Sequence, residues 1–296
     1  MSWLRIVHET VYRYSRPVRF GPHRLILRPR EGHDVRVERM GLEIEPEFEL
    51  EWSRDVFGNS VATAHLLRRA EELRIRSDVV LQHTAPFPQR SNRPPAVVPF
   101  PVTFSIFESD VAAAYLATTY PDDVPRVRAW MERTIESASI RSAEEVVARV
   151  ADAIRKNIKY RRREEKGVQS PGETLARGSG SCRDLATLLL ESLRSVGLPA
   201  RFASGYLDCA ASEAGRASTH AWAEAYLPEL GWTGYDPTIG EPTSSKHVVT
   251  GVSNHPRGVM PITGSFYDDQ GSYLEMEVAV QTEHFEEPPP HLHARA

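Results

Sequence analysis

The sequence predicts an α+β fold in two parts: a β-sandwich over residues 1–100, followed by a mixed domain of helices and strands over residues 101–285. Two observations support this division. Short runs that alternate polar and apolar residues, typical of half-buried strands, dominate the first part. Helical periodicity begins only after a proline-rich segment at residues 84–101, which we interpret as a linker. Residues 286–296 contain three successive prolines, so we expect a disordered tail there.

Within the first part, the alternating runs are RIVHETVYRY at residues 5–14, VRVERMGLEIEP at residues 35–46 and ELRIR at residues 72–76. Turn residues such as Gly58 and Asn59 separate them. His8 lies within the first run beside tyrosines, and we interpret it as a packed strand residue. No group of residues in this part suggests catalysis.

Three helices are expected in the second part. The first starts near Pro121, with two aspartates in its first turn. The second has the capping-box pattern of Ser142 and Glu145. The third runs from Cys182 along an apolar stripe and stops before Gly197. Strand patterns follow as ARFASGYL at 200–207, HAWAEAYL at 220–227, GWTGYDPT at 231–238 and YLEMEVAVQ at 273–281.

Composition excludes several function classes. The formal net charge of −4 gives no global field that would favour nucleic acid or an anionic membrane. No apolar stretch approaches the ~20 residues that span a bilayer, and the N-terminus lacks the apolar region of a signal peptide. The two cysteines, Cys182 and Cys209, form neither a disulfide framework nor a zinc motif. We therefore expect a cytoplasmic protein without metal or cofactor.

Cys182 lies in GSGSCRDLATLLLESLRSVG, residues 178–197, where small residues precede a lone cysteine at the start of a predicted helix. A helix N-terminus carries about half a positive charge and unpaired N–H groups, which stabilise an anion such as a thiolate. The preceding glycines allow tight turning and close approach of a substrate. Cys182 is thus a candidate nucleophile, although a small buried residue at a helix entrance would produce the same local pattern.

A thiol nucleophile needs a histidine as base and acid, and a carboxylate or amide that orients the imidazole. In HAWAEAYL, alternation places His220 and Trp222 on one face of a strand. The turn at LPEL reverses the chain towards Asp236, and the midpoint of His220 and Asp236 falls within that turn. Residues equidistant from a hairpin turn lie opposite or nearly so, with Cβ atoms ~4.5–5.5 Å apart. Asp236 could also be only a turn residue before Pro237.

The blocks GSCRDLATLLLESLRSVGLPARFASGYL and HAWAEAYLPELGWTGYDPT resemble the transglutaminase-like superfamily, closely between Tyr160 and Ile239. RIVHETVYRYSRPVRFGPHRLILRPR resembles the β-rich domain that precedes this core in bacterial members. The resemblance implies a transglutaminase/papain-like core, with the nucleophile at a helix N-terminus packed on an antiparallel sheet. Its triad falls on Cys182, His220 and Asp236. Many relatives have an acidic, glycine-led segment where this chain has GVSNHPRGVMP, so specificity can differ.

Three further residues are candidates for shaping the site. Tyr160 and Gln169 lie upstream of the nucleophile and could supply the second oxyanion donor, although each could equally be structural. Trp222 follows the candidate histidine on the same strand face.

The expected function is thiol acyl transfer on a peptide, protein or small amide. Water as the second substrate gives a cysteine protease or amidase, and an amine gives a protein-glutamine transglutaminase. We favour hydrolysis, because water is present at ~55 M and cross-linking needs a site that excludes it. Alternatives are acetyl transfer, as in arylamine acetyltransferases, and a non-catalytic binding module on the same scaffold. The sequence shows no acidic loop with EF-hand spacing, so calcium activation is not indicated.

Overall fold

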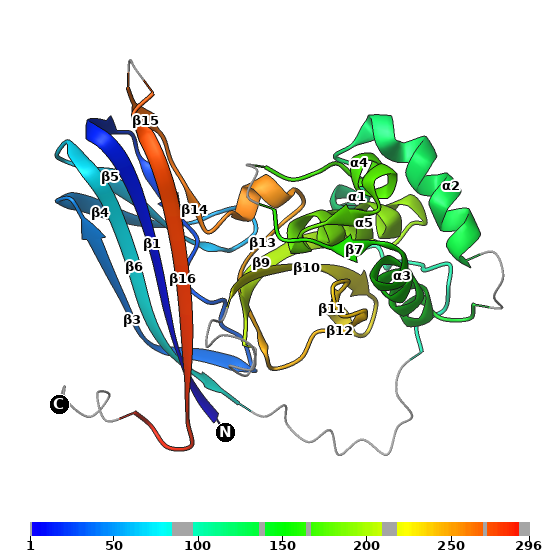
Figure 1. The fold of residues 1–296 in the computed structure, drawn as a ribbon. Coiled ribbons are helices and arrows are strands. Elements are labelled where there is room, and N and C mark those ends of the chain that lie inside the picture. Colours follow the sequence, from blue (N-terminus) through cyan, green and yellow to red (C-terminus); the bar gives the residue numbers. More distant parts are fainter. Residues whose placement is uncertain are drawn as a thin grey trace.

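The computed structural model describes residues 2–84, 97–135, 140–163, 167–208, 218–268 and 271–289. A β-sandwich forms one side of the molecule, and helices packed on a third sheet form the other (Figure 1). The expected α+β fold is confirmed. No helix in the described ranges is both long and apolar enough to cross a membrane.

The sandwich consists of two antiparallel sheets. One has the order β15-β1-β6-β3, with β16 also paired to β1, and the other has the order β14-β2-β5-β4. Their bounds are β1 (Ser2–Phe20), β2 (His23–Leu25), β3 (Val35–Glu45), β4 (Phe48–Arg54), β5 (Ser60–Leu66), β6 (Ala70–His83), β14 (Ile262–Thr263), β15 (Phe266–Tyr267) and β16 (Tyr273–Phe285). Tyr14 and Ile75 of the first sheet pack with Leu25 and Ala62 of the second in one buried cluster.

The C-terminal strands correct the expected domain boundary. Residues 101–285 are expected from the sequence to form the second domain, but β16 pairs with β1 from Trp3–Phe285 to Tyr14–Tyr273. β14 and β15 likewise pair with β2 and β1. The chain therefore leaves the sandwich after β6 and returns to it at β14. Residues 85–96 of the expected linker and 290–296 of the expected tail lie outside the described residues.

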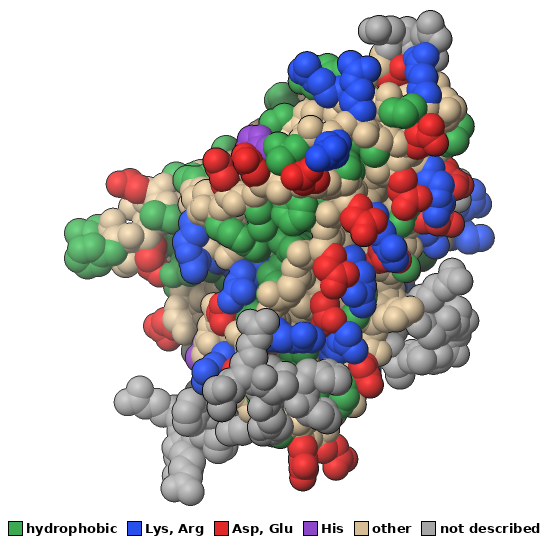
Figure 2. Space-filling view, turned by 90° about the vertical axis from the view of Figure 1, so that its left-hand side faces the viewer, with side chains coloured by type: hydrophobic (Ala, Val, Ile, Leu, Met, Phe, Trp, Pro, Cys, Tyr) green, Lys and Arg blue, Asp and Glu red, His purple; other side chains and the backbone are tan. Residues whose placement is uncertain are grey.

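The outer face of the first sheet carries cross-strand ion pairs. Examples are Arg74 with Glu9 on β1, and Arg76 with Glu43 on β3. Figure 2 shows acidic and basic side chains interleaved on the side of the molecule that carries the strands. Because the two signs alternate, this face presents no extended patch of one charge.

The second domain contains α1 (Ser109–Leu116), η1 (Pro121–Asp123), α2 (Val124–Ile135), α3 (Ala143–Asn157), α4 (Pro171–Arg177), α5 (Cys182–Ser195) and η2 (Pro256–Val259). Its antiparallel sheet has the order β12-β11-β10-β9-β13, formed by β9 (Ala200–Leu207), β10 (Ser218–Leu227), β11 (Gly231–Asp236), β12 (Glu241–Pro242) and β13 (His247–Ser253). A short parallel pair joins β7 (Lys159–Tyr160) to β8 (Ser179–Gly180).

Helix α5 is the centre of this domain. Ala221, Ala223 and Leu227 on one face of β10 belong to the same buried cluster as the leucines of α5. The opposite face of β10 carries Trp222, which packs with Ala203 and Val252 of the neighbouring strands. The alternation expected for HAWAEAYL is confirmed, and this arrangement holds the start of α5 in a fixed position on the sheet.

One face of β1 packs on both domains. Tyr14 on this face contacts the second sheet of the sandwich, whereas Leu4 and Ile6 join Tyr206 and Val248 of the second domain in another buried cluster. Between them, His8 Nδ1 lies 3.0 Å from the Tyr206 hydroxyl. The domains are thus joined through an apolar cluster that includes this buried polar contact, and His8 is the packed strand residue that the sequence predicts.

Burial lowers the pKa of His8 from 6.5 to about 4. As the pH falls, the unfolded chain binds a proton at His8 at a higher pH than the folded chain does. The free energy of unfolding should therefore fall as the pH drops from about 6.5 towards 4. The shift corresponds to roughly 3 kcal/mol. Urea unfolding at pH 7 and pH 4.5 measures this loss.

His8→Gln, which keeps a hydrogen-bonding side chain without titrating, should show a smaller loss over the same window. An equal loss in both proteins would show that His8 does not carry this pH dependence.

Candidate active site

Cys182 is the first residue of α5 and is partly exposed. Its helix starts with a capping box, in which Asp184 accepts from the Ser181 backbone N–H and hydroxyl, each at 2.8 Å. Gly180 is required by this turn, because a Cβ there would lie 2.7 Å from the Asp184 Cβ. The small residues before Cys182 therefore let the chain pass close to the helix that presents the thiol.

Asp184 is fully buried and organises the turn around the thiol. Besides the Ser181 contacts, its Oδ1 accepts from the Gln169 backbone N–H at 2.8 Å. Arg163 Nε lies 2.8 Å from its Oδ2. The carboxylate thus joins three chain segments behind Cys182, which explains why an acidic residue follows the cysteine in an otherwise apolar helix.

His220 and Asp236 meet across the β10–β11 hairpin. His220 Nε2 lies 2.7 Å from Asp236 Oδ2. The register pairs Ala223 with Tyr235, so Asp236 is a diagonal neighbour of His220 and not its direct partner. The turn is centred on Glu229, which has a left-handed φ of 68°, and not on Pro228, so the register is offset by two positions from a direct pairing of His220 with Asp236. Diagonal pairs remain within reach of long side chains.

Asp236 is fully buried and accepts four hydrogen bonds. Its Oδ2 lies 2.7 Å from His220 Nε2 and 3.2 Å from His247 Nε2. Its Oδ1 accepts from the Thr238 backbone N–H at 2.9 Å and from the Thr238 hydroxyl at 2.7 Å. Burial alone would raise the pKa of Asp236, but these donors lower it well below its usual range. The carboxylate is therefore ionised.

His220 connects the carboxylate to the thiol. Because Nε2 faces Asp236, Nδ1 is left for the hydrogen bond with Cys182. Burial lowers the pKa of His220, but the hydrogen bonds and charges of Asp236 and Cys182 outweigh burial and raise it to about 10. A positively charged imidazolium is therefore stable beside Cys182 at neutral pH. The structure brings the three sequence-predicted residues together in one hydrogen-bonded chain.

Two family models match the chain in the two domains. Residues 4–82 match the bacterial transglutaminase-like N-terminal region, and residues 128–237, which contain the hydrogen-bonded chain, match the transglutaminase-like superfamily. Over these two ranges, the chain matches the transglutaminase-like superfamily. The resemblance recognised in the sequence is confirmed.

Some similar proteins match nearly the whole chain, and others match only part of it. An uncharacterized protein from Mycobacterium tuberculosis is 27% identical over 289 residues, covering 93% of this chain and 91% of the relative. A protein-glutamine gamma-glutamyltransferase from Pseudomonas aeruginosa is 38% identical over 66 residues, covering 20% of this chain and 10% of that protein. A crystal structure of a "Putative Cysteine Protease" from Cytophaga hutchinsonii has a TM-score of 0.69 at 15% identity, covering 95% and 90% of the two chains. This last likeness shows a shared fold.

The remaining site candidates of this transglutaminase-like core take different positions. Tyr160 is half exposed on β7, and although burial is the main cause of its raised pKa, the charges of Cys182 and Asp236 contribute. Tyr160 is thus the candidate that lies beside the thiol. The Gln169 side chain is buried, and its Oε1 accepts from the Thr174 hydroxyl at 3.2 Å.

Trp222 supports the site from within the fold. Its ring is fully buried. The ring centroid lies 5.1 Å from that of His247, in a T-shaped contact, and 6.3 Å from that of His220. It therefore packs against the two histidines and is not accessible to a substrate.

His247 and Thr238 are site residues that sequence reasoning missed. His247 lies outside the quoted blocks, and Thr238 is the last residue of GWTGYDPT. Both reach Asp236 because β13 and the turn after β11 fold back onto the hairpin. Among the described residues, His220, Asp236 and His247 are close enough to hold a metal, with ligand atoms within 4.8 Å of one another. Both Nε2 atoms, however, already face the same carboxylate oxygen, so the group is satisfied by its own hydrogen bonds.

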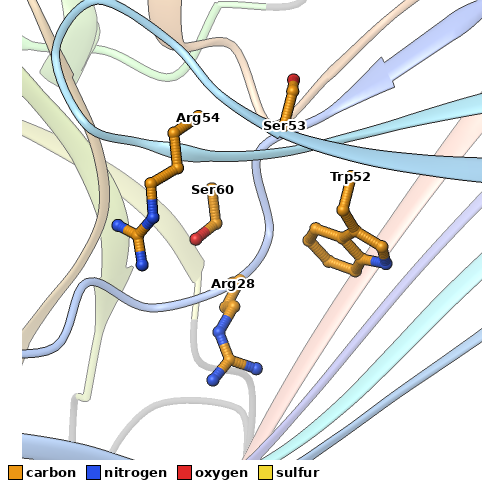
Figure 3. Close-up of a pocket in the computed structure, with 5 residues that line it drawn as sticks. All are labelled: Arg28, Trp52, Ser53, Arg54 and Ser60. Atoms are coloured by element: carbon orange, nitrogen blue, oxygen red, sulfur yellow. The ribbon is translucent and has the colours of Figure 1, made fainter.

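A separate cavity lies in the N-terminal domain and contains none of these residues. It has a volume of about 410 Å³ and is lined by Arg28, Trp52, Ser53, Arg54 and Ser60. Figure 3 shows the Arg54 guanidinium on one side of Ser60 and the Trp52 indole on the other, with the Arg28 guanidinium below. This cavity thus lies in a different domain from the thiol.

Proposed function

We propose that the chain is a thiol acyl-transfer enzyme in which Cys182 is the nucleophile, His220 the acid and base, and Asp236 the group that orients His220. The observation that carries the proposal is the hydrogen-bonded chain from the Cys182 thiol through His220 to the buried, ionised Asp236. The match to the transglutaminase-like superfamily supports the same class.

In the first half-reaction, Cys182 Sγ attacks the carbonyl carbon of an amide and forms a tetrahedral intermediate. The backbone N–H of Cys182, at the start of α5, is placed to donate to the oxyanion. The His220 imidazolium gives its proton to the leaving amine as the carbon–nitrogen bond breaks, and a thioester remains. In the second half-reaction, His220 takes a proton from water, the hydroxide oxygen bonds to the carbonyl carbon, and the thiolate leaves.

We favour hydrolysis of a peptide, protein or small amide, without a cofactor and without a nucleic-acid or membrane partner. The partial exposure of Cys182 supports this choice, because a site open to water does not protect a thioester from it. Transfer to an amine is the second candidate, favoured by the local similarity to the P. aeruginosa gamma-glutamyltransferase. A non-catalytic module would be expected to lack a member of the triad. The cytoplasmic location remains a prediction.

Thioester trapping tests this function. The wild-type protein is incubated with glutamine, γ-glutamyl and peptide amides, quenched in acid, and examined by mass spectrometry for an acyl group on Cys182. A carboxylic acid product indicates hydrolysis, and a new amide formed with an added amine indicates transfer. Cys182→Ala should form no adduct with any substrate. Absence of both adduct and turnover across the panel would favour the binding module.

Alkylation provides a test that needs no substrate. Limited iodoacetamide at pH 6 should modify Cys182 much faster than Cys209, because the His220 imidazolium stabilises a thiolate at Cys182. Cys209 lies outside the described residues and follows Asp208, whose negative charge disfavours a thiolate. Peptide mass spectrometry at successive times gives the two rates.

His220→Ala is the matched control for alkylation. It should remove most of the preference for Cys182 and leave the rate at Cys209 unchanged. Equal rates at both cysteines in the folded wild-type protein would argue against an activated thiol. A Cys182 that reacts only after mild denaturation would instead indicate a site closed to the reagent.

A further inference from the structure

We propose that His247 is a positioning residue of this site, a second histidine that donates from its neutral form to the carboxylate oxygen that also binds His220. The proposal rests on the proposed function of Cys182 and His220. His247 begins β13, whereas His220 lies on β10 and Asp236 ends β11, so three strands converge on one carboxylate.

The protonation state of His247 follows from its two hydrogen bonds. The Ser244 backbone N–H donates to His247 Nδ1 at 3.1 Å, so this nitrogen carries a lone pair and no proton. The proton of the neutral ring is therefore on Nε2, which lies 3.2 Å from Asp236 Oδ2 and faces it as a donor. A charged His247 would direct a second N–H at the Ser244 N–H and lose that bond.

A neutral donor at this position differs from a cation. It stabilises the ionised carboxylate through a hydrogen bond, yet it brings no positive charge that would repel the His220 imidazolium 6.2 Å away between ring centroids. Together with the two bonds from Thr238 to Oδ1, it occupies the remaining acceptor positions of Asp236. The carboxylate is thereby held in one plane, which sets the direction of the His220 ring.

His247 acts through Asp236 and not on a substrate. Its side chain is only 3% exposed. The buried Trp222 ring packs against it, and its backbone N–H bonds to the Ser244 carbonyl at 2.9 Å. The ring cannot turn towards the thiol without breaking these contacts, so its role is to hold the carboxylate.

Two substitutions distinguish the hydrogen-bond donor of His247 from the space that its ring fills. His247→Phe keeps a flat ring and removes the donor. His247→Gln keeps an N–H donor that can reach Asp236 Oδ2. A lost hydrogen bond to a charged group corresponds to about a 10-fold to 100-fold loss in the rate that depends on it. We expect the pH 6 alkylation rate of Cys182 to fall by this factor in His247→Phe, because the His220 ring is no longer held in the direction of the thiol, and to recover to within about threefold in His247→Gln.

The pH profile of alkylation gives a readout that a purely structural role would not change. The titratable groups around His220 are Asp236 on β11, Cys182 on α5, His247 on β13 and Tyr160 on β7, and only His247 differs between the proteins. When His247 no longer shares the carboxylate, Asp236 attracts the imidazolium more strongly. The upper inflection of the profile should move to higher pH by about half a unit in His247→Phe, and not in His247→Gln.

The experiment measures the Cys182 alkylation rate from pH 5 to pH 11 in the wild type and both variants, with thermal unfolding to confirm that each is folded. Wild-type rates and inflections in His247→Phe would overturn the proposal, as would equal defects in His247→Phe and His247→Gln. If the wild type itself shows no reactivity that depends on His220, the proposed function fails and this inference fails with it.

Discussion

Asp236→Asn should lower kcat on a verified amide substrate by about 10⁴-fold while the protein stays folded. The amide carries no negative charge, so the imidazolium that forms on His220 loses its main stabilising partner. The amide also presents an NH₂ group where His220 Nε2 and His247 Nε2 both require an acceptor. The measurement is steady-state kinetics, with circular dichroism as the check on folding.

Asp152→Asn is the matched control for this substitution. Asp152 forms a surface pair with Lys156 on α3, at 2.6 Å, and the change has the same chemistry away from the thiol. We expect wild-type kcat in this control. Near-normal turnover in Asp236→Asn would mean that Asp236 acts only as a turn residue before Pro237.

Asp184→Ala should destabilise the protein by about 3–5 kcal/mol, because it leaves the largely buried Arg163 without the carboxylate 2.8 Å away. It also leaves the Ser181 and Gln169 backbone N–H groups without their acceptor. For a chain of this size, the melting temperature should fall by roughly 6–15 °C. Differential scanning calorimetry gives both the melting temperature and the enthalpy of unfolding.

Glu173→Ala removes a carboxylate from a solvent-exposed pair with Arg177 on α4 and serves as the control. Exposed pairs contribute about 0–1 kcal/mol, so its melting temperature should stay within a few degrees of the wild type. A similarly small change in Asp184→Ala would show that the segments around Cys182 are held by packing and not by this carboxylate.

The position of Cys182 at a helix start and the proximity of His220 to Asp236 could each be predicted from a short stretch of sequence. Cys182 begins a helix whose apolar stripe and final Gly197 are evident in the sequence. His220 and Asp236 are joined by a short hairpin. Pattern reasoning placed the two residues opposite each other, yet the register is offset by two positions. The left-handed conformation of Glu229 centres the turn and so sets the register. A glutamate at that position does not indicate this conformation from the sequence.

The long-range parts of the fold could not be predicted in this way. YLEMEVAVQ has a strand pattern, but alternation does not say which sheet a strand joins, and β16 pairs with β1 about 260 residues earlier. For the same reason His247 was overlooked. Its contact with Asp236 depends on β13 lying beside β9, a pairing set by the packing of the whole sheet.

The return of the chain to the sandwich has a consequence for synthesis on the ribosome. β1 emerges first, but its partner β16 is about 250 residues further along. At 5–20 residues per second, β1 waits on the order of 10–50 s with one edge unpaired. An unpaired edge of 19 residues is a template for another strand, so the growing chain is exposed to mispairing during that interval. The charged side chains Arg5, Glu9 and Arg13, spaced along one face of β1, are the feature that would discourage such an encounter before β16 arrives.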